Sequence, residues 1–227
     1  MPSDLSWAAY QHQTHGYVTL TMAVVTLLHV IYIVDFFLNE DWYTKTIDIT
    51  HDHFGFMLAW GDTTFLPAFY TLQTQYLARY PTYLSTLQSL SILALGVAGY
   101  AIFRSANHQK HVARATNGIC TLWGKPATSI RCAYSTADGA SHETILLTSG
   151  WWGVCRHTNY LADLVQAFAM CATCGVTHFL PWSYFFYMVI LLNHRVWRDE
   201  ARCRAKYGEK WDEYCAEVRW RLVPYVY

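Results

Sequence analysis

The chain has 227 residues, of which 53% are hydrophobic, 17% aromatic and only 14% charged. A soluble domain carries about 25% charged residues, so the shortage of charge indicates a membrane protein. The formal net charge of zero argues against nucleic acid as a partner, because phosphate binding needs an excess of Lys and Arg. Lys45 and Arg79 are the only Lys or Arg before residue 100, whereas eight lie between Arg195 and Arg221. The chain is therefore apolar early and polar late.

Three apolar stretches in the first 103 residues are long enough to cross a bilayer. The first is Tyr17–Leu38 and the third is Leu87–Phe103, which contains no charge. The second, Phe54–Leu77, is interrupted by Asp62 and Pro67. We therefore expect about three membrane-spanning helices in this part of the chain.

A polar segment follows from Arg104 to about Ser149, and its glycines and the turn at 137–139 predict a solvent-facing loop with a short β-hairpin. Two further apolar pieces, Leu161–Gly175 and Val176–Leu192, are each marginal for a full span. Because glycine and proline lie between them, they predict a helical hairpin that is tightly packed or partly re-entrant in the membrane.

The sequence from His194 onward is polar and helical. Tyr207, Trp211 and Tyr214 recur at helical spacing and are expected on one face, and Gly208 predicts a break between two short helices. Clusters of Arg and Lys follow the third span and the helical hairpin, so the positive-inside rule predicts that both flanks are cytosolic.

The predicted fold class is all-α, a polytopic membrane helical bundle with a cytosolic C-terminal helical tail. We divide it into residues 1–103, which hold the N-terminal transmembrane helices, and residues 104–227, which hold the cytosolic loop, the membrane helical hairpin and the tail.

Metal and redox chemistry find little support in the sequence. Cys171 and Cys174 form a CxxC motif without a second pair, whereas zinc needs four ligands, so they are predicted to be structural thiols. His51 and His53 flank Asp52, but residues two apart face in different directions on a helix. No metal is predicted.

Ionisable residues inside apolar stretches are functional suspects because their burial in a membrane is costly. Asp35 and Asp163 are read more readily as helix-end residues near headgroups, and His29 and His178 are weaker cases. For Asp62, a structural hydrogen bond and a role toward substrate remain equally open.

Two clusters at the membrane boundary suggest an anion-binding site. Lys110 and Arg114 stand four residues apart, share a helix face and repel one another, so together they favour an anion such as a phosphate. A juxtamembrane basic patch that contacts anionic lipid is the alternative. The run from Gly150 to Tyr160 combines aromatic rings with Arg156 and an amide, which suits either an interfacial aromatic belt or a nucleotide pocket.

Two longer strings are similar to the signatures of the sterol reductase family, which includes delta-14 and delta-7 sterol reductases. They are LLTSGWWGVCRHTNYLAD (146–163) and HRVWRDEARCRAKYGEKWDEYC (194–215). The resemblance covers nearly the whole chain and corresponds to the C-terminal half of family members. THDHFG (50–55), ANHQK (106–110) and STADG (135–139) more closely resemble the delta-7 branch.

The resemblance implies NADPH as the cofactor, in a cytosol-facing pocket formed by the last helices and the tail. By motif position, Lys110 and Arg114 hold phosphate, in the region of the adenosine 2′-phosphate. The resemblance assigns further cofactor-binding roles to Leu147, Trp152, Asn159, Tyr160, Asp199, Cys203, Arg204, Lys206, Tyr207 and Tyr214.

The resemblance also implies a reaction, the reduction of the C7–C8 double bond of a delta-7 sterol such as 7-dehydrocholesterol. A sterol diene has no carbonyl to polarise the alkene for hydride attack, so we expect a protein acid to reach and protonate the ring carbon before hydride transfer. Asp199 is the first candidate proton donor, ahead of a buried tyrosine or an acid of the 46–53 string. The implied partners are the sterol, membrane lipid and other membrane enzymes of sterol synthesis. The implied location is the endoplasmic reticulum membrane, crossed several times.

Three alternatives remain open from the sequence. One is delta-14 reduction, and another is a truncated, non-catalytic protein that binds sterol or NADPH. The third is a membrane methyltransferase of the isoprenylcysteine type, suggested by Arg156-His157 and Asn159-Tyr160. That family usually has proline where this chain has Thr158, and its S-adenosylmethionine gives no use for Lys110 and Arg114.

Overall fold

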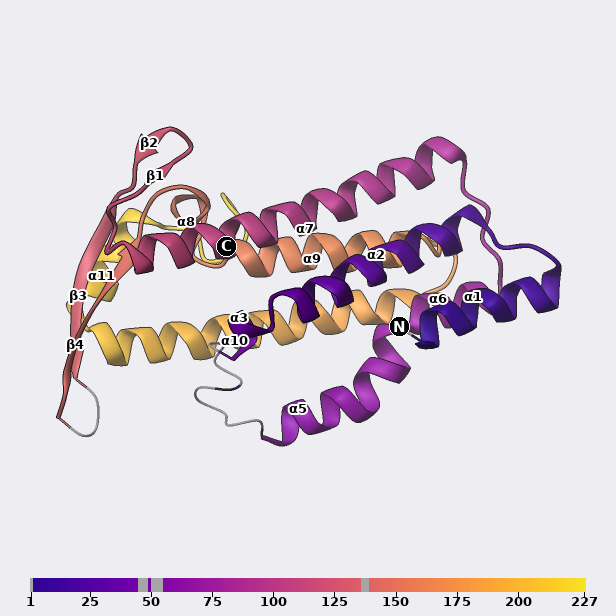
Figure 1. Cartoon of the computed structure of the whole chain (residues 1–227), viewed down its shortest axis with the longest axis horizontal. Coiled ribbons are helices and arrows are strands. Elements are labelled where there is room, and N and C mark those ends of the chain that lie inside the picture. The colour runs from indigo at the N-terminus through magenta and orange to yellow at the C-terminus, as the bar shows by residue number, and fades with distance from the viewer. Residues whose placement is uncertain (1, 45–48, 50–54, 136–138) are drawn as a thin grey trace. The chain divides into compact units, whose positions relative to one another are not determined.

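The fold was analysed in a computed structural model that describes residues 2–44, 49, 55–135 and 139–227. The described residues are mostly helical, and Figure 1 labels their elements. The helices are α1 (Pro2–His15), α2 (Leu20–Leu38), α3 (Glu40–Tyr43), α5 (Phe56–Trp60), η1 (Gly61–Tyr70), α6 (Leu72–Arg79), α7 (Thr86–Ala115), α8 (Trp151–Val154), α9 (Thr158–Ala172), η2 (Leu180–Trp182), α10 (Ser183–Tyr207) and α11 (Glu209–Glu217). The strands are β1 (Thr121–Leu122), β2 (Lys125–Pro126), β3 (Ser129–Ser135) and β4 (Ser141–Leu147).

Among the residues that the structure describes, two helices are long and apolar enough to cross a membrane, α2 and α7. Both were expected, but α7 continues for 12 residues beyond Phe103, into the segment read as a loop. Helix-forming residues such as Ala106, Gln109 and Lys110 explain this continuation, because polarity alone does not end a helix.

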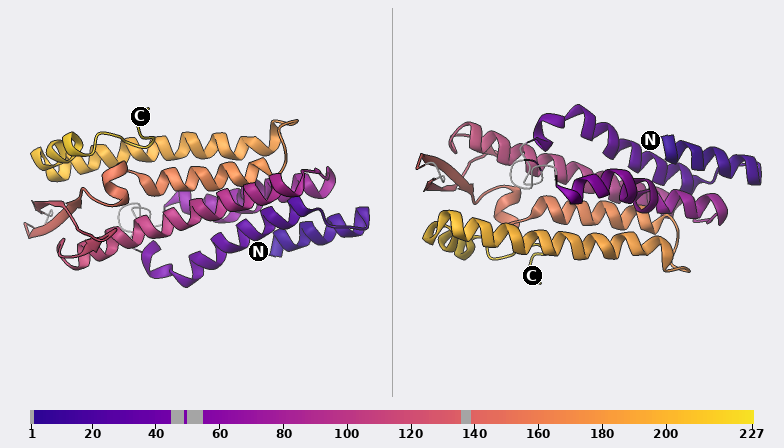
Figure 2. Two further views of the ribbon diagram at one scale, coloured as in Figure 1. Left: turned by 90° about the horizontal axis from the view of Figure 1, so that it is seen from above. Right: turned by 90° about the horizontal axis from the view of Figure 1, so that it is seen from below.

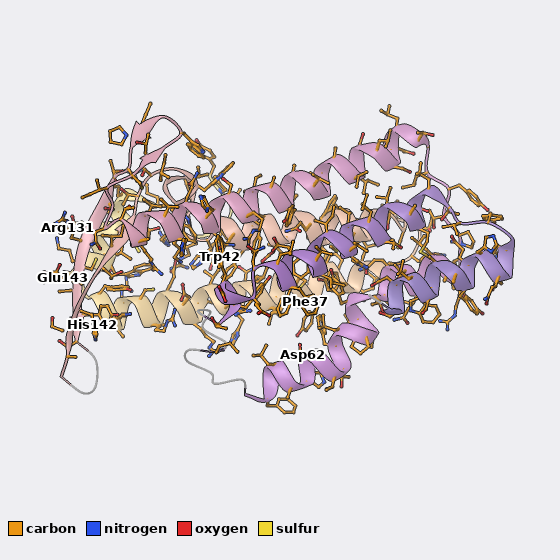
Figure 3. The ribbon with its side chains drawn as sticks, in the orientation of Figure 1. Phe37, Trp42, Asp62, Arg131, His142 and Glu143 are labelled. Carbon is orange, nitrogen blue, oxygen red and sulfur yellow. The ribbon has the colours of Figure 1, made fainter. Side chains whose placement is uncertain are left out.

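The expected second span, 54–77, is not one continuous helix in its described part. It is divided into α5, the π-helix η1 and α6, and Pro67 lies inside η1. Proline has no N–H to donate, so one backbone hydrogen bond of the helix is missing at this position. Thr71 Oγ1 and Gln75 Nε2 donate to the Pro67 carbonyl oxygen at 2.8 Å and 3.2 Å. Asp62, on η1, is exposed rather than deep (Figure 3).

The all-α expectation is corrected by two antiparallel hairpins, β1–β2 and β3–β4. The longer one pairs Ser129 with Leu147 and Ser135 with Ser141. On β3, Ile130 and Cys132 are buried and Arg131 is exposed, and this alternation is the period-two pattern of a strand with one covered face. The short hairpin expected in the polar segment is therefore present, with strands of seven residues each.

The described residues form two compact units, one of 1–98 with 165–187 and the other of 99–164 with 188–227. In the first unit, Met22, Val25 and Leu28 of α2 and Leu77 of α6 are buried. Buried polar side chains also connect the helices of this unit. His29 Nδ1 of α2 lies 2.9 Å from Asp4 Oδ1 of α1. Thr74 Oγ1 donates to the same carboxylate at 3.1 Å, and Gln11 Nε2 donates to the Leu77 carbonyl at 2.7 Å.

The CxxC cysteines belong to this first unit and are buried structural thiols, as predicted. Cys171 Sγ donates to the Pro181 carbonyl at 3.2 Å, and Cys174 Sγ donates to the Gln73 carbonyl at 3.7 Å. All seven cysteines are free, and the described residues contain no cluster of three or more His, Cys, Asp or Glu that could hold a metal.

The second unit places the β3–β4 hairpin against α11, and Figure 2 shows these elements at the same end of the unit in both views. Trp211 and Tyr214 of α11 are buried with Ile130, Cys132 and Leu146 of the hairpin, and Tyr207 packs against them. Gly208, with φ +54°, divides α10 from α11 as expected. The aromatic face predicted for the tail is therefore the face that the hairpin covers.

Candidate functional site

Every residue assigned to the site by family resemblance lies in the second unit, which comes from two separate stretches of chain. The first stretch carries Lys110 to Tyr160 and the second carries Asp199 to Tyr214. The C-terminal end of α7 and the short helix α8 form one side of the site.

Three hydrogen bonds fix α8 against α7. Trp151 Nε1 donates to Ser105 Oγ at 2.9 Å, and Trp152 Nε1 donates to the Ala106 carbonyl at 2.7 Å. The Trp151 backbone N–H donates to Gln109 Oε1 at 2.9 Å. This close approach requires glycine at position 150, which has φ +63° and whose added Cβ would lie 2.2 Å from Gln109 Oε1.

Lys110 is held beside an aromatic ring, with Nζ 4.2 Å from the Trp152 ring centroid. Trp152 is 5% exposed and is buried with Ala113 and Leu147. A cation over an indole face is attracted by the ring quadrupole. The structure thus brings together three predicted cofactor residues, Lys110, Leu147 and Trp152, in one packed cluster.

Helix α10 contributes charges to the same region. Asp199 Oδ1 lies 2.6 Å from Arg202 Nη2. Burial, together with nearby Asp199, raises the pKa of Cys203 to about 12, against the opposing effect of Arg202, Lys110 and Arg114. Cys203 is therefore a neutral thiol among three cations and one carboxylate, in a net positive environment.

A second group of predicted residues surrounds the hairpin. Lys206 Nζ lies 3.5 Å from the Tyr134 ring centroid and 5.3 Å from that of Tyr207. Burial raises the pKa of Tyr207, and it raises the pKa of Tyr214 well above its ordinary value. Both phenols therefore remain protonated at neutral pH, and Tyr214 is a core residue as well as a site candidate.

Asn159 and Tyr160 lie in the first turn of α9, beside the buried imidazole of His157. The Tyr160 and His157 rings stack with centroids 5.4 Å apart and planes 8° apart. Arg195 Cζ lies 6.0 Å from the Tyr160 ring centroid. Burial lowers the pKa of His157 to about 4, aided by Lys110, Arg156 and Arg221 and opposed by Asp199. This imidazole is neutral at physiological pH.

One assigned residue, Arg204, forms its ion pair away from this group. Arg204 makes an exposed ion pair with Asp212 at 2.8 Å, and its role as a cofactor contact remains a prediction. The acids of the 46–53 string, considered as alternative proton donors, lie outside the described residues, as does most of THDHFG.

Sequence reasoning did not assign a role to Arg156, although it lay in the aromatic run. Arg156 and Glu200 form an ion pair at 2.8 Å, with side chains 5% and 12% exposed. Arg156 Nη1 also donates to the carbonyls of Val218 and Arg219 at 2.7 Å and 3.0 Å. Arg221 Nε lies 3.0 Å from the same Glu200 carboxylate. An arginine buried between charged and backbone acceptors thus fastens the C-terminal residues to α10.

This arrangement fits a phosphorylated nucleotide. Lys110, Arg114 and Arg202 provide an excess of cationic donors, which are the strongest partners for phosphate oxygens. Trp152 and Tyr160 supply aromatic faces in the same unit. His157 Nε2 is buried without a hydrogen-bond partner among the described residues. This ring nitrogen is therefore left to accept or donate a further hydrogen bond.

Comparison with known proteins agrees with the two signature strings. The sequence model of the Ergosterol biosynthesis ERG4/ERG24 family matches residues 3–227. A 7-dehydrocholesterol reductase of Danio rerio is 53% identical over 99% of this chain and 47% of that protein. The Xenopus laevis protein of the same name is 53% identical over 97% of the chain and 47% of its own length.

A Delta(14)-sterol reductase of Methylotuvimicrobium alcaliphilum is 45% identical over 99% of this chain and 50% of that protein. The chain therefore spans about half the length of the curated relatives that it matches. The match nonetheless covers both signature strings and every assigned site residue. This chain belongs to the ERG4/ERG24 family of sterol reductases.

Proposed function

We propose that this chain is the cofactor-binding half of an NADPH-dependent sterol reductase that reduces the C7–C8 double bond. The observation that carries this proposal is the cationic cluster of Lys110, Arg114 and Arg202 beside Trp152, in a chain of the sterol reductase family. The delta-7 assignment is supported by the two 53% identical relatives, both named 7-dehydrocholesterol reductase.

In this proposal Lys110 and Arg114 bind the adenosine 2′-phosphate region, and Trp152, Asn159 and Tyr160 line the nucleotide. Guanidinium and ammonium donors discriminate for the extra phosphate because each adds a charge-assisted contact. Leu147, Tyr207 and Tyr214 support this surface from the core. When bound, NADPH supplies the hydride that the alkene receives.

Asp199 is the proposed proton donor to the ring alkene. Asp199 Oδ1 lies 2.6 Å from Arg202 Nη2, so the carboxyl is held beside the cationic cluster. A general acid must carry its proton when it reacts, so in this proposal Asp199 is protonated when it acts on the bound sterol.

The experiment that tests the cofactor proposal is nucleotide binding to the detergent-solubilised chain. NADPH, NADH and S-adenosylmethionine are compared for the wild type and for Lys110→Ala/Arg114→Ala. We expect selective NADPH binding that the double substitution weakens at least about tenfold, corresponding to about 1.4 kcal/mol. Arg131→Ala is the matched control, because Arg131 is an exposed cation on β3 outside the assigned site.

Loss of NADPH selectivity in the control, or equal binding by wild type and double variant, would contradict the cofactor site. Binding of S-adenosylmethionine alone would favour the methyltransferase alternative. NADPH binding without turnover of 7-dehydrocholesterol or a delta-14 sterol would favour the non-catalytic alternative.

The proton-donor role has its own test in the complete reductase. Asp199→Asn should retain NADPH binding and abolish sterol turnover, and unchanged turnover would exclude Asp199 as the donor. Delta-14 reduction is the second candidate activity because a relative 45% identical carries that name. Parallel assays with both sterols distinguish the two activities.

The proposed location is the endoplasmic reticulum membrane, with several crossings and with the second unit facing the cytosol. The two apolar helices α2 and α7 and the Arg and Lys residues that follow the uncharged stretch of α7 support this orientation. Other membrane enzymes of sterol synthesis are proposed partners, since sterol intermediates are insoluble in water.

A further inference from the structure

The β1–β2 hairpin ends in a turn whose first residue is a strained tryptophan. Trp123 has φ +50° and Gly124 has φ +77°. Two successive left-handed residues define the type I′ turn, in which Asn-Gly and Asp-Gly are preferred. A bulky residue in this region is an outlier, and such strain points to a role for the side chain.

One side of the hairpin is fixed and the other side is exposed. Leu122 is buried in the cluster of Ala113, Ile145, Leu147 and Trp152. Trp123 is 59% exposed, and Ile119, just before β1, is 80% exposed. The hairpin therefore holds two large apolar side chains outward on a well-packed base.

Contacts in the second unit determine how far along α7 the tip of the hairpin lies. The Trp123 and Trp151 rings meet edge to face with centroids 5.0 Å apart, and Trp151 Nε1 bonds to Ser105. Ser105 comes two residues after Phe103, where the uncharged stretch of α7 ends. Helix α7 runs ten residues further to Ala115, about 15 Å of helix, before the chain returns.

The hairpin thus folds back along α7 and brings Trp123 close to the end of the apolar stretch. That level is the boundary between hydrocarbon and headgroups, where tryptophan is enriched in membrane proteins. Figure 1 shows the hairpin beside α8, at the end of the second unit that also carries the last turns of α7.

The charge around the tip suits lipid phosphate. No Asp or Glu occurs between Asp62 and Asp138, while this segment contains Arg104, next to Ser105 on α7, and Lys125, on β2. Lys125 is exposed and lies two residues after Trp123. Lys and Arg near a membrane surface are attracted to anionic lipid.

We propose that the β1–β2 hairpin is an interfacial anchor. Trp123 and Ile119 insert among the phospholipid headgroups where α7 leaves the bilayer, and Lys125 contacts lipid phosphate. By holding the hairpin at the membrane surface, the anchor fixes the start of β3 and the buried side chain of Leu122. Leu122 packs in the cluster around Trp152, so the anchor also holds that cluster in place. This proposal is independent of which nucleotide binds there.

The test uses the complete protein in nanodiscs of phosphatidylcholine and phosphatidylserine. A photoreactive benzoylphenylalanine replaces Trp123, and a matched protein carries the same label in place of Arg131. Figure 3 shows Arg131 on the outer edge of the β3–β4 hairpin, so it is an exposed control position of the same unit. After illumination, mass spectrometry identifies the adducts.

A phospholipid adduct at position 123 that exceeds the adduct at position 131 by at least fivefold is expected. An adduct to a second copy of the chain or to another protein would overturn the proposal in favour of a protein interface. Equal or absent lipid adducts at the two positions would also overturn it.

The second variant is Trp123→Asn, which removes the ring but supplies a residue that the turn prefers, so folding is retained. Amide hydrogen exchange in 119–127 should become at least threefold faster in nanodiscs, with the same thermal stability as wild type in detergent. Unchanged exchange in this segment would show that the ring does not anchor the hairpin.

Discussion

Arg156 is a buried cation that is surrounded by hydrogen-bond acceptors. It pairs with Glu200 and donates to two backbone carbonyls near the C-terminus. A buried charge depends on its partners, because removing one of them leaves the other desolvated and unpaired. Arg204 makes an ion pair of similar length, 2.8 Å, but both side chains of that pair are more than half exposed. The two arginines therefore differ in burial rather than in chemistry.

Arg156→Gln should reduce the free energy of unfolding by about 3–5 kcal/mol, whereas Arg204→Gln should reduce it by at most about 1 kcal/mol. Thermal unfolding of the detergent-solubilised protein measures both effects as shifts of apparent Tm. Similar shifts for the two variants would contradict the burial argument.

His157 makes the second unit sensitive to acid. Its pKa is about 4 in the folded protein against an ordinary value of 6.5, because burial disfavours the imidazolium. The unfolded chain therefore binds the proton more readily, and the stability from neutral His157 is complete above about pH 6.5. It is lost progressively as the pH falls from about 6.5 to about 4, by roughly 1.4 kcal/mol per pH unit.

His157→Gln should flatten the fall of apparent Tm between pH 6.5 and pH 4.5, even if it lowers the Tm at neutral pH. His108 is exposed, so His108→Gln is the matched control and should leave the slope unchanged. A slope that is the same in wild type and His157→Gln would exclude His157 as its source.

At the scale of elements, the approach of α2 and α7 depends on a glycine. A Cβ added at Gly96 of α7 would lie 2.6 Å from Leu28 Cδ2 of α2. Leucine favours a helix over glycine by roughly 0.8–1 kcal/mol, so propensity alone would make a substitution stabilising. Overpacking costs about 1–3 kcal/mol, and therefore the clash decides the sign.

Gly96→Leu should lower the apparent Tm, and Leu28→Ala should lower it by leaving a cavity. In the double variant the new leucine fills that cavity. The decrease in Tm should therefore be smaller than the sum of the decreases in the two single variants. Thermal unfolding of the four proteins gives the coupling. Strict additivity would mean that the two helices do not meet at these residues.

At the scale of the whole molecule, the membrane explains the exposed apolar surface. The protein itself buries only 17% of the most apolar part of α7. Leucines such as Leu87 and Leu95 on this helix are exposed. In water such a surface would be a large apolar patch, whereas in a bilayer it contacts lipid tails. The family membership and the two apolar helices agree on this environment.

Leu95→Arg should impair membrane insertion, since an arginine near the centre of a span costs about 2.5–3.5 kcal/mol on insertion scales. Ala133→Arg is the control, because Ala133 is exposed on β3 outside the spans. Carbonate extraction of isolated membranes measures the inserted fraction. Equal retention of both variants would argue that α7 does not span.

Periodicity and composition determined much of this protein without its structure. Apolar runs predicted α2 and the first half of α7, and the helical spacing of Tyr207, Trp211 and Tyr214 predicted the covered face of the tail. These properties depend on residues close together in the sequence and on whether their side chains favour water or an apolar environment. The signature strings predicted the family for the same reason, since they are contiguous.

Contacts between distant residues were decided only by the tertiary structure. The Arg156–Glu200 pair, the ring of Trp152 over Lys110 and the return of Trp123 toward Ser105 join segments that a sequence reads separately. Pro67 similarly lies inside a π-helix instead of at a simple interruption, and its carbonyl oxygen accepts side-chain hydrogen bonds from Thr71 and Gln75. Local propensity determines which elements form, whereas burial and partner geometry determine which side chains meet.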